Sequence, residues 1–212
     1  MPSCFITLEG PEGCGKSTQA RLLADALLER GVSVKLTREP GGDPVGEEIR
    51  KILLDGADHS VADRTEVLLY EAARAQHTES VIRPHLAQGC VVICDRFADS
   101  TVAYQGYGSG IDLDVIRRLN SFATGGLEPD MTFLIDIDTE TGLKRQQEWN
   151  RMERKALNYH ERVRQGFLRE ASLNPERITI LDAMSDIETI HQQILAIVER
   201  KLELSTQPGG ER

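Results

Sequence analysis

The chain has 212 residues, of which 40% are hydrophobic, enough for one domain with a sizeable core. Its formal net charge of −9 argues against a general nucleic-acid or membrane-surface binder, because either partner selects a basic face. No apolar run is long enough to span a bilayer and no signal region opens the chain, so we expect a soluble, cytoplasmic protein. The four cysteines contain no C-x-x-C pair, which favours reduced thiols over disulfides or a zinc site.

Short apolar runs recur along the chain and predict the strands of one sheet. Each run is followed by turn-forming or charged residues, as is typical of strands. The expected strands cover residues 4–8, 32–36, 90–94, 131–135 and 177–181. The run at 90–94 is continuously apolar, which suits a strand covered on both faces, as in a parallel sheet.

Helical periodicity fills the stretches between these strands. The first expected helix begins at Thr18, and the others occupy about 44–55, 65–88, 112–124, 139–173 and 186–203. The stretch 95–108, rich in Ser, Gly and Tyr, is expected to be a loop. Strands that alternate with helices predict an α/β fold, with a five-stranded parallel sheet and helices on both faces. Ligands then bind where the strands end.

The segment 10–17 reads G-P-E-G-C-G-K-S, which is the P-loop pattern G-x-x-x-x-G-K-[ST] between an expected strand and an expected helix. Glycine-rich turns before helices are common, but here the Lys-Ser pair and both flanking elements are present. Backbone N–H groups of such a loop bind phosphates, Lys16 reaches the β- and γ-phosphates, and Ser17 ligates Mg²⁺. The residues expected around the nucleotide phosphates are Gly10, Pro11, Glu12, Gly13, Cys14, Gly15, Lys16, Ser17 and Thr18. The pattern predicts that the chain binds a nucleoside triphosphate.

Two residues, Asp95 and Cys14, remain open to two interpretations each. Asp95 ends an apolar strand, so it is either a Walker-B carboxylate that holds Mg²⁺ or the cap of the following turn. Its neighbour Arg96 is placed to bind phosphate oxygens bidentately. Cys14 is either a reactive thiol at a helix N-terminus or a thiol packed beneath the loop.

The stretch from about 142 to 170 is more basic than acidic, although the whole chain is acidic. A solvated helix with i,i+4 ion pairs accounts for some of this charge. We favour a lid at about 142–156 that carries Arg145, Arg151 and Arg154 over the nucleotide, because phosphoryl transfer depends on neutralising charge. The expected organisation is thus one domain over 1–204 with a small helical lid, followed by a disordered tail at 205–212.

A second group of residues suits recognition of a nucleotide base. Tyr70 and Arg74 are four apart on one face of an expected helix, and Tyr104 and Gln105 follow Arg96 in the chain. An aromatic ring, an amide and guanidinium groups stack a base, read its edge and hold its phosphate. Taken singly, each of these residues is more often a packing or surface residue.

Four short motifs in order after the P-loop resemble bacterial thymidylate kinase. They are T-R-E-P-G-G at 37–42, Y-E-A-A-R at 70–74, D-R-F at 95–97 and A-Y-Q-G at 103–106. The resemblance covers about residues 4–204. It implies transfer of the γ-phosphate of ATP to dTMP, giving dTDP and ADP, by a cytoplasmic homodimer with Mg²⁺.

The resemblance also implies roles for individual residues. It places against dTMP the residues Glu12, Glu39, Pro40, Arg50, Tyr70, Arg74, Arg96, Thr101, Tyr104 and Gln105. Tyr70 stacks on thymine, while Arg74, Thr101 and Gln105 contact the base. Arg96 and Arg50 bind the acceptor phosphate, with Glu39 nearby.

By the same resemblance, Tyr104 occupies the space of a ribose 2′-hydroxyl, and Glu12 contacts the 3′-hydroxyl. Some family members carry an arginine where this chain has Gly13, and others supply the positive charge from the lid. This chain is similar to the second kind, so Lys16, Arg96, Arg151 and Arg154 are the expected catalytic residues.

Two other functions compete with this one. A P-loop kinase for another nucleoside monophosphate would share most of these motifs. A GTP-driven switch protein would need a guanine-reading N-K-x-D after a later strand, and the sequence contains none. The acidic chain gives no reason to expect a nucleic-acid or membrane partner.

Overall fold

The computed structural model describes residues 3–54, 61–145 and 155–203, and its strands form one parallel sheet. The strands are Cys4–Glu9 (β1), Val34–Arg38 (β2), Val91–Asp95 (β3), Met131–Asp136 (β4) and Ile178–Asp182 (β5). Their order is β2-β3-β1-β4-β5, so the expected five-stranded parallel sheet is confirmed. β2 begins two residues later than expected, because the N–H of Val32 still bonds to Leu27 O at the end of the preceding helix (3.0 Å).

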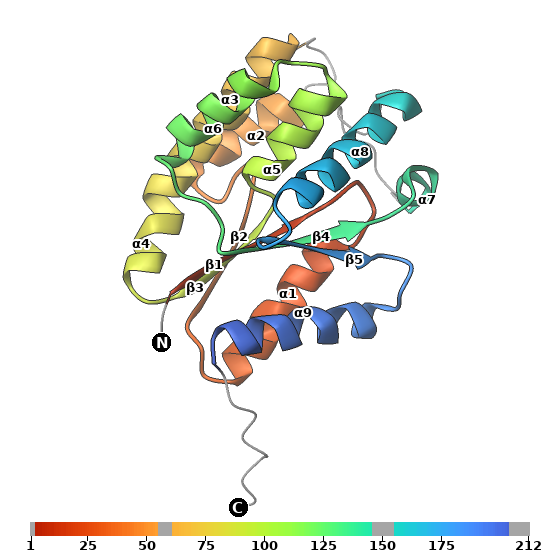
Figure 1. Ribbon diagram of the computed structural model, residues 1–212. Coiled ribbons are helices and arrows are strands. Elements are labelled where there is room, and N and C mark those ends of the chain that lie inside the picture. The colour runs from red at the N-terminus through yellow and green to blue at the C-terminus, as the bar shows by residue number, and fades with distance from the viewer. Residues whose placement is uncertain (1–2, 55–60, 146–154, 204–212) are drawn as a thin grey trace, which may run out of the picture.

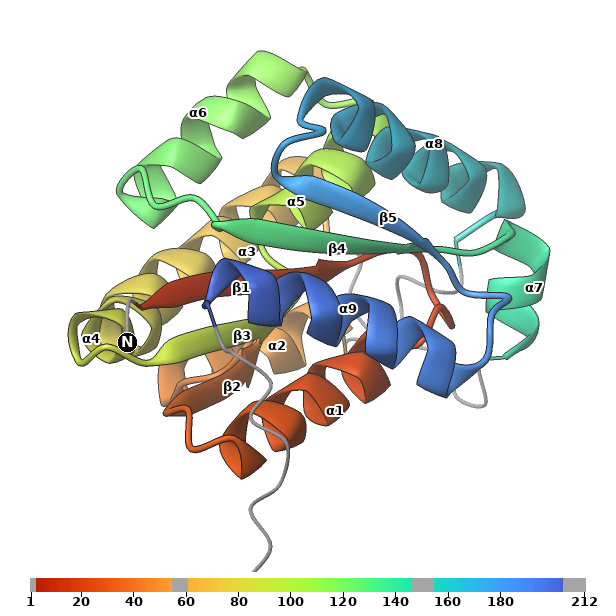
Figure 2. The same ribbon diagram turned by 60° about the horizontal axis from the view of Figure 1, so that its bottom comes forward.

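Helices cover both faces of this sheet, as the alternation of elements predicts. They are Lys16–Glu29 (α1), Pro44–Leu54 (α2), Asp63–His77 (α3), the π-helical Thr78–Ile82 (η1), Arg83–Ala87 (α4), Ala98–Thr101 (α5), the π-helical Val102–Gly108 (η2), Leu113–Thr124 (α6), Thr139–Lys144 (α7), Leu157–Leu173 (α8) and Ile187–Lys201 (α9). α1 and α9 lie side by side on one face, while α3, α5, α6 and α8 lie on the other (Figures 1 and 2).

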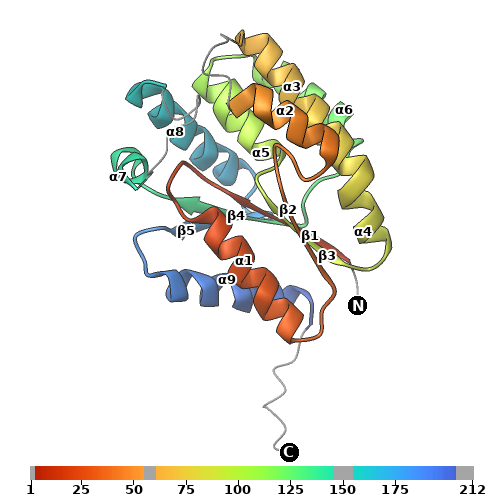
Figure 3. The same ribbon diagram turned by 180° about the vertical axis from the view of Figure 1, so that it is seen from behind.

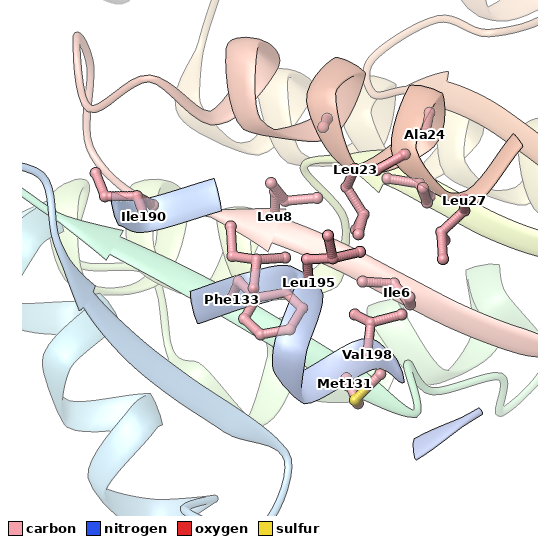
Figure 4. Close-up of a cluster of buried hydrophobic side chains, with 14 of the residues drawn as sticks. Ile6, Leu8, Leu23, Ala24, Leu27, Met131, Phe133, Ile190, Leu195 and Val198 are labelled. Carbon is pink, nitrogen blue, oxygen red and sulfur yellow. The ribbon is translucent and has the colours of Figure 1, made fainter. Parts of the chain in front are cut away.

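The largest apolar cluster lies between the sheet and the α1–α9 layer. Figure 4 shows Leu8 of β1 and Phe133 of β4 packed against Leu23 of α1 and Leu195 of α9. Leu8, Phe133 and Leu23 are completely buried. This packing fixes the end of β1, and therefore fixes the loop between β1 and α1.

The stretch 98–108 is helical, so the expected loop there is wrong. Tertiary packing overrides the low helix propensity of its glycines and serines. A Cβ at Gly108 would lie 2.8 Å from Val163 Cγ2 of α8, and the Tyr159 hydroxyl of α8 donates to Tyr104 O (3.0 Å). The glycines therefore let η2 approach α8 closely and do not mark a turn.

The helix expected at 65–88 is present as three consecutive segments, α3, η1 and α4. Pro84 in the first turn of α4 lacks an N–H, so regular i→i−4 bonding cannot run through it, and the π-helical η1 precedes it. The helix at 112–124 is confirmed as α6, with Asp112 accepting from two backbone N–H groups at its N-terminus.

The expected lid and tail lie mostly outside the described residues. α7 covers the start of the lid, while Trp149, Arg151 and Arg154 fall within the undescribed 146–154. Residues 205–212 are likewise undescribed. Within the described part of the chain, no helix combines the length and apolarity needed to cross a membrane.

The carboxyl ends of β1, β2 and β3 meet at one edge of the sheet. Leu8 pairs with Asp95, and Asp95 pairs with Arg38, so the segments after all three strands begin at the same level. In the view from behind, the β1–α1 loop and the end of β2 lie toward the same side of the molecule (Figure 3). The fold thus gathers the predicted chemistry at one edge, as expected for an open parallel sheet.

Candidate nucleotide-binding site

A cavity of about 430 Å³ opens at the carboxyl edge of the sheet. It is lined by Glu12, Gly13, Gly15, Lys16, Ser17, Thr18, Arg38, Glu39, Pro40, Arg50, Leu54, Tyr70, Arg74, Asp95, Arg96, Ser100, Thr101, Tyr104, Gln105 and Arg145. One end is the P-loop and the other is enclosed by α2, α3 and η2. Its volume falls within the range of small-molecule sites.

The P-loop wraps around the side chain of Lys16. Lys16 Nζ donates to Gly10 O (2.9 Å) and Pro11 O (2.8 Å), and it lies 3.3 Å from Cys14 Sγ. Gly15 has a φ of 95°, a left-handed conformation that favours glycine, and this turns the chain into α1. Cys14 is buried, as the packed-thiol interpretation requires.

Gly13 and Gly142 bring the P-loop against α7. A Cβ on Gly13 would run into the Gly142 carbonyl, and a Cβ on Gly142 would run into Glu12 O. Gly13 also has a φ of 69°. An arginine at position 13 would therefore displace α7, so this loop geometry is specific to a chain with glycine there.

Ser17 and Asp95 meet across the strand ends, where the Ser17 hydroxyl donates to an Asp95 carboxylate oxygen. Both side chains offer oxygen ligands of the kind that Mg²⁺ prefers. Where Mg²⁺ binds together with substrate phosphates, proteins supply only one or two ligands, and phosphate oxygens and water supply the others. No cluster of three or more His, Cys, Asp or Glu suited to a metal occurs among the described residues. The Ser17–Asp95 pair is thus compatible with a magnesium ion carried by a nucleotide.

Arg96 lies between the P-loop and η2. Its Nη2 bonds to Glu12 Oε2 (2.9 Å), and its guanidinium stacks 5.0 Å from the centre of the Tyr104 ring. The Tyr104 hydroxyl donates to Glu12 Oε1 (2.7 Å). Burial alone would raise the pKa of Glu12, but the charges of Arg96 and Lys16 hold it below its usual value. Burial raises the pKa of Tyr104 well above its ordinary value, so its hydroxyl remains a donor.

Arg74 is the centre of a buried polar network. Its side chain is 2% exposed and donates to Glu39 Oε2, Glu71 Oε1, Thr101 Oγ1, Asn120 Oδ1 and Phe97 O at 2.6–3.0 Å. Burial would lower the pKa of Arg74, but Glu39 and Glu71 outweigh it and raise the pKa above its ordinary value. Among the described residues, these bonds use four of the five N–H groups of Arg74. One N–H of Nη2 is left to donate to a ligand.

Two further cations face the cavity near Arg96. Arg50 Nη1 donates to Pro40 O (2.9 Å), and Arg38 pairs with Glu47 through two 2.9 Å bonds. Burial lowers the pKa of Arg50, and the like charges of Arg38 and Arg96 lower it further. Guanidinium groups that repel one another beside a cavity are suited to sharing an anion.

The remaining base-recognition residues lie on α3, α5 and η2. Gln105 Nε2 donates to the buried Glu66 Oε1 (2.9 Å), which orients its amide. Thr101 is buried and its hydroxyl accepts from Arg74 (2.9 Å). Tyr70 is half-buried and lines the same cavity.

The structure therefore brings together most of the residues singled out from the sequence. Gly10, Pro11 and Cys14 lie beneath the cavity lining, and Arg151 and Arg154 fall outside the described residues. Three lining residues were not singled out, namely Arg38, Leu54 and Ser100. Arg38 belongs to the quoted T-R-E-P-G-G motif, so its position at the carboxyl end of β2 was an available signal.

Comparison with known proteins gives a consistent result. The sequence model of the thymidylate kinase family matches residues 8–194. A thymidylate kinase from Roseiflexus castenholzii is 51% identical, with 93% of each chain covered. One from Geotalea daltonii is 47% identical, covering 94% of this chain and 98% of its own.

A solved structure agrees with these sequence matches. The crystal structure of thymidylate kinase from Ehrlichia chaffeensis superposes with a TM-score of 0.78 at 39% identity, covering 94% of this chain and 99% of its own. The P-loop, the parallel sheet that carries it and the matched length agree on one conclusion: the chain belongs to the thymidylate kinase family.

Proposed function

We propose that this protein transfers the γ-phosphate of ATP to dTMP, giving dTDP and ADP. One observation carries the proposal: the P-loop and a separate group of guanidiniums, Arg50 and Arg96, line a single cavity. That arrangement offers a triphosphate site and a second anion site facing each other, as transfer between two nucleotides requires. The relatives named thymidylate kinase support the choice of dTMP.

The ATP side uses the P-loop. Its backbone N–H groups and the N-terminus of α1 would hold the β- and γ-phosphates. Lys16 Nζ, which bonds to two loop carbonyls, would turn to the phosphate oxygens. Arg145, whose Nη1 reaches Ala183 O (3.3 Å), lies at the α7 edge of the cavity.

The acceptor side would hold the dTMP phosphate with Arg96 and Arg50. The attacking oxygen is already anionic, because the second pKa of a phosphate monoester is about 6, so no general base is needed. Positioning for in-line attack and neutralisation of charge then supply the catalysis.

The thymine end would lie against Tyr70, Arg74, Thr101 and Gln105. The uncommitted Nη2 proton of Arg74 and the oriented Gln105 amide are suited to a base edge. Tyr104 and Glu12, held together by a 2.7 Å bond, would face the sugar. A closely packed Tyr104 disfavours a 2′-hydroxyl and therefore a ribonucleotide.

Magnesium fits this site through Ser17 and Asp95 together with phosphate oxygens. When bound, it supplies Lewis-acid neutralisation of the β- and γ-phosphate oxygens. Asp95→Asn should raise the Mg²⁺ concentration needed for half-maximal activity, as measured by metal titration of turnover.

We further propose that residues 1–204 form one kinase domain whose lid, at about 142–156, brings Arg151 and Arg154 to the transferred phosphate. A homodimer through α3 and α6 is part of the proposal. Phe122 is 86% exposed and shares a face of α6 with the exposed Val115, while Leu68 is exposed on α3. Light scattering of Phe122→Glu should then show loss of the dimer. A cytoplasmic location stays a prediction from the sequence.

ADP release measured with dTMP, dUMP, dCMP, AMP, GMP and UMP as acceptors tests the function. We expect dTMP to be used at least about 10²-fold more efficiently than the ribonucleotides, because the site is built to hydrogen-bond its substrate. Preference for another monophosphate would instead support the competing kinase function. ADP release that ignores every acceptor would contradict both.

A further inference from the structure

Glu9 is a buried carboxylate at the end of β1 that no step of the proposed reaction uses. Its side chain has no solvent exposure. Oε1 accepts from Phe97 N (2.7 Å) and Ser100 N (3.3 Å), and Oε2 accepts from Ser100 Oγ (2.6 Å). Glu9 therefore binds the segment that directly follows Arg96.

These hydrogen bonds restrain the backbone at Arg96. Arg96 has a φ of 72°, an uncommon conformation for a residue with a side chain, which persists only when its surroundings hold it. Leu8 O accepts from Arg96 N (3.0 Å), and Glu9 fixes the next N–H along the chain, that of Phe97. Two residues at the end of β1 thus hold the backbone N–H groups of Arg96 and of the residue that follows it.

The same carboxylate reaches the Arg96 side chain. Ser100 Oγ donates its only proton to Glu9, so its lone pairs are left to accept from Arg96 Nη1 (3.3 Å). A chain of hydrogen bonds therefore runs from the Arg96 guanidinium through Ser100 to Glu9. The second guanidinium nitrogen, Nη2, remains on Glu12.

Burial, together with the nearby charge of Asp99, raises the pKa of Glu9 to about 7, although the Ser100 hydrogen bond and the Arg96 charge oppose the shift. Asp99 itself is held by two bonds to Arg177 (2.7 and 2.9 Å). Other titratable groups that interact with Glu9 are Arg177, Arg74 of α3 and Cys94 of β3. Glu9 therefore changes charge close to neutral pH, in direct contact with the residues that hold Arg96.

We propose that Glu9 is a positioning residue: through the Phe97 N–H and the Ser100 hydroxyl it sets the orientation in which Arg96 receives the acceptor phosphate. This inference rests on the proposed role of Arg96 in binding a nucleoside monophosphate. Glu9 is not among the residues that line the cavity, so it acts on the acceptor only through these two groups.

Glu9→Gln tests the proposal, because the amide keeps the size of the side chain and removes its charge. Steady-state kinetics are measured with dTMP varied at saturating ATP, and then with ATP varied at saturating dTMP. We expect the KM for dTMP to rise about tenfold, as expected when a charged acceptor is lost, while the KM for ATP stays unchanged. Ser100→Ala, which removes only the side-chain branch, should raise the KM for dTMP about threefold.

Thr7→Val is the matched control. Thr7 lies on the same strand and the same face, is equally buried, and bonds to Thr132 Oγ1 (2.7 Å). We expect it to lower stability without changing either KM. A rise in the KM for dTMP in all three variants alike would assign Glu9 a general structural role and overturn the proposal.

The pH dependence separates positioning from simple loss of packing. Protonated Glu9 resembles glutamine in shape and charge, so the ratio of kcat/KM for dTMP between wild type and Glu9→Gln should approach 1 below about pH 6 and grow through pH 7. Ionisation of dTMP itself cancels in this ratio. A ratio that does not vary with pH would overturn the proposal.

Three further outcomes are decisive. If Glu9→Gln does not fold, Ser100→Ala still decides, since an unchanged KM for dTMP in that variant rejects the hydrogen-bond chain. If the wild type shows no dTMP-dependent ADP release, the proposed function fails and this inference fails with it. If the wild type is active but both variants keep its KM for dTMP, only the inference is rejected.

Discussion

The two ends of the cavity are built in different ways. The triphosphate end is a backbone structure, in which one continuous segment folds around Lys16 and packs against α7 through two glycines. The acceptor end is made of side chains from α2, α3, α5 and η2 and from the segments directly after β2 and β3, and it is held together by the buried Arg74 network. We therefore expect that side chains at the first end can be changed at a smaller cost in stability than those at the second end, which combine binding with stability.

Lys16→Met should give the largest loss of activity. Removal of the charge that meets the β- and γ-phosphates is expected to lower kcat by about 10³-fold. Because Nζ makes two hydrogen bonds to loop carbonyls, each worth about 0.5–1.5 kcal/mol, the unfolding free energy should fall by about 1–3 kcal/mol. Turnover assays and urea unfolding measure the two effects, with the exposed Lys201→Met as control. A variant that is inactive only because it is unfolded would contradict the comparison.

Arg74→Met should show the opposite behaviour at the acceptor end. It leaves the carboxylates of Glu39 and Glu71 buried without their partner, which is expected to cost about 3–5 kcal/mol of unfolding free energy. Arg64→Met, on an exposed position of the same helix, should cost less than about 0.5 kcal/mol. Equal stability of the two variants in urea titrations would remove the distinction between the two ends.

Arg96→Ala should lower kcat/KM for dTMP by about 10²-fold, because it removes a charged donor to the acceptor phosphate. Its KM for ATP should change little. The control is Arg169→Ala, at an exposed position of α8. Kinetics close to wild type in Arg96→Ala would refute the assigned role.

The contact between the P-loop and α7 offers a smaller test. Gly142→Ala would push a Cβ into Glu12 O, and overpacking of this kind costs about 1–3 kcal/mol. We expect the KM for ATP to rise about five- to tenfold, whereas Glu140→Ala, exposed on the same helix, should leave it unchanged. An unchanged KM in Gly142→Ala would show that the loop does not depend on α7.

The last test concerns the dependence of stability on pH. The pKa of Glu9 is raised from 4.5 in the unfolded chain to about 7 in the folded protein. Between these values the folded state retains a proton that the unfolded state releases, so this group lowers the unfolding free energy as pH rises from about 4.5 to about 7. Urea unfolding at several pH values should show that Glu9→Gln lacks this decline. Parallel pH curves for wild type and variant would contradict it.

The difference between the two ends also explains what the sequence could predict. The P-loop is a contiguous string with a fixed spacing, so its strand, turn and helix follow from local rules. The Arg74 network joins Glu39 to Asn120 through Arg74, and Arg74 and Asn120 are themselves 46 positions apart in the sequence. No local spacing rule predicts such a pairing. Arg74 was singled out from its spacing to Tyr70, and Glu39 and Thr101 through resemblance to a family, while Glu71 and Asn120 were assigned no role.

The wrongly expected loop and the overlooked Glu9 have the same cause, because both depend on contacts between distant parts of the chain. The stretch 98–108 contains residues that favour loops, and it becomes helical because η2 packs against α8. Glu9 directly follows the apolar run 4–8 in the sequence, and its role depends on where Phe97 and Ser100 lie in three dimensions. Local patterns therefore predicted the sheet and the phosphate loop, while tertiary contacts decided the acceptor site.

A crystal structure of the protein with dTMP and a non-hydrolysable ATP analogue tests the central claim most directly. The account predicts the analogue's terminal phosphate within hydrogen-bond distance of Lys16 Nζ and the dTMP phosphate bound by the Arg96 guanidinium, with the two phosphates facing each other. A dTMP phosphate bound away from Arg96, or thymine located outside the space between Tyr70 and Arg74, would contradict it.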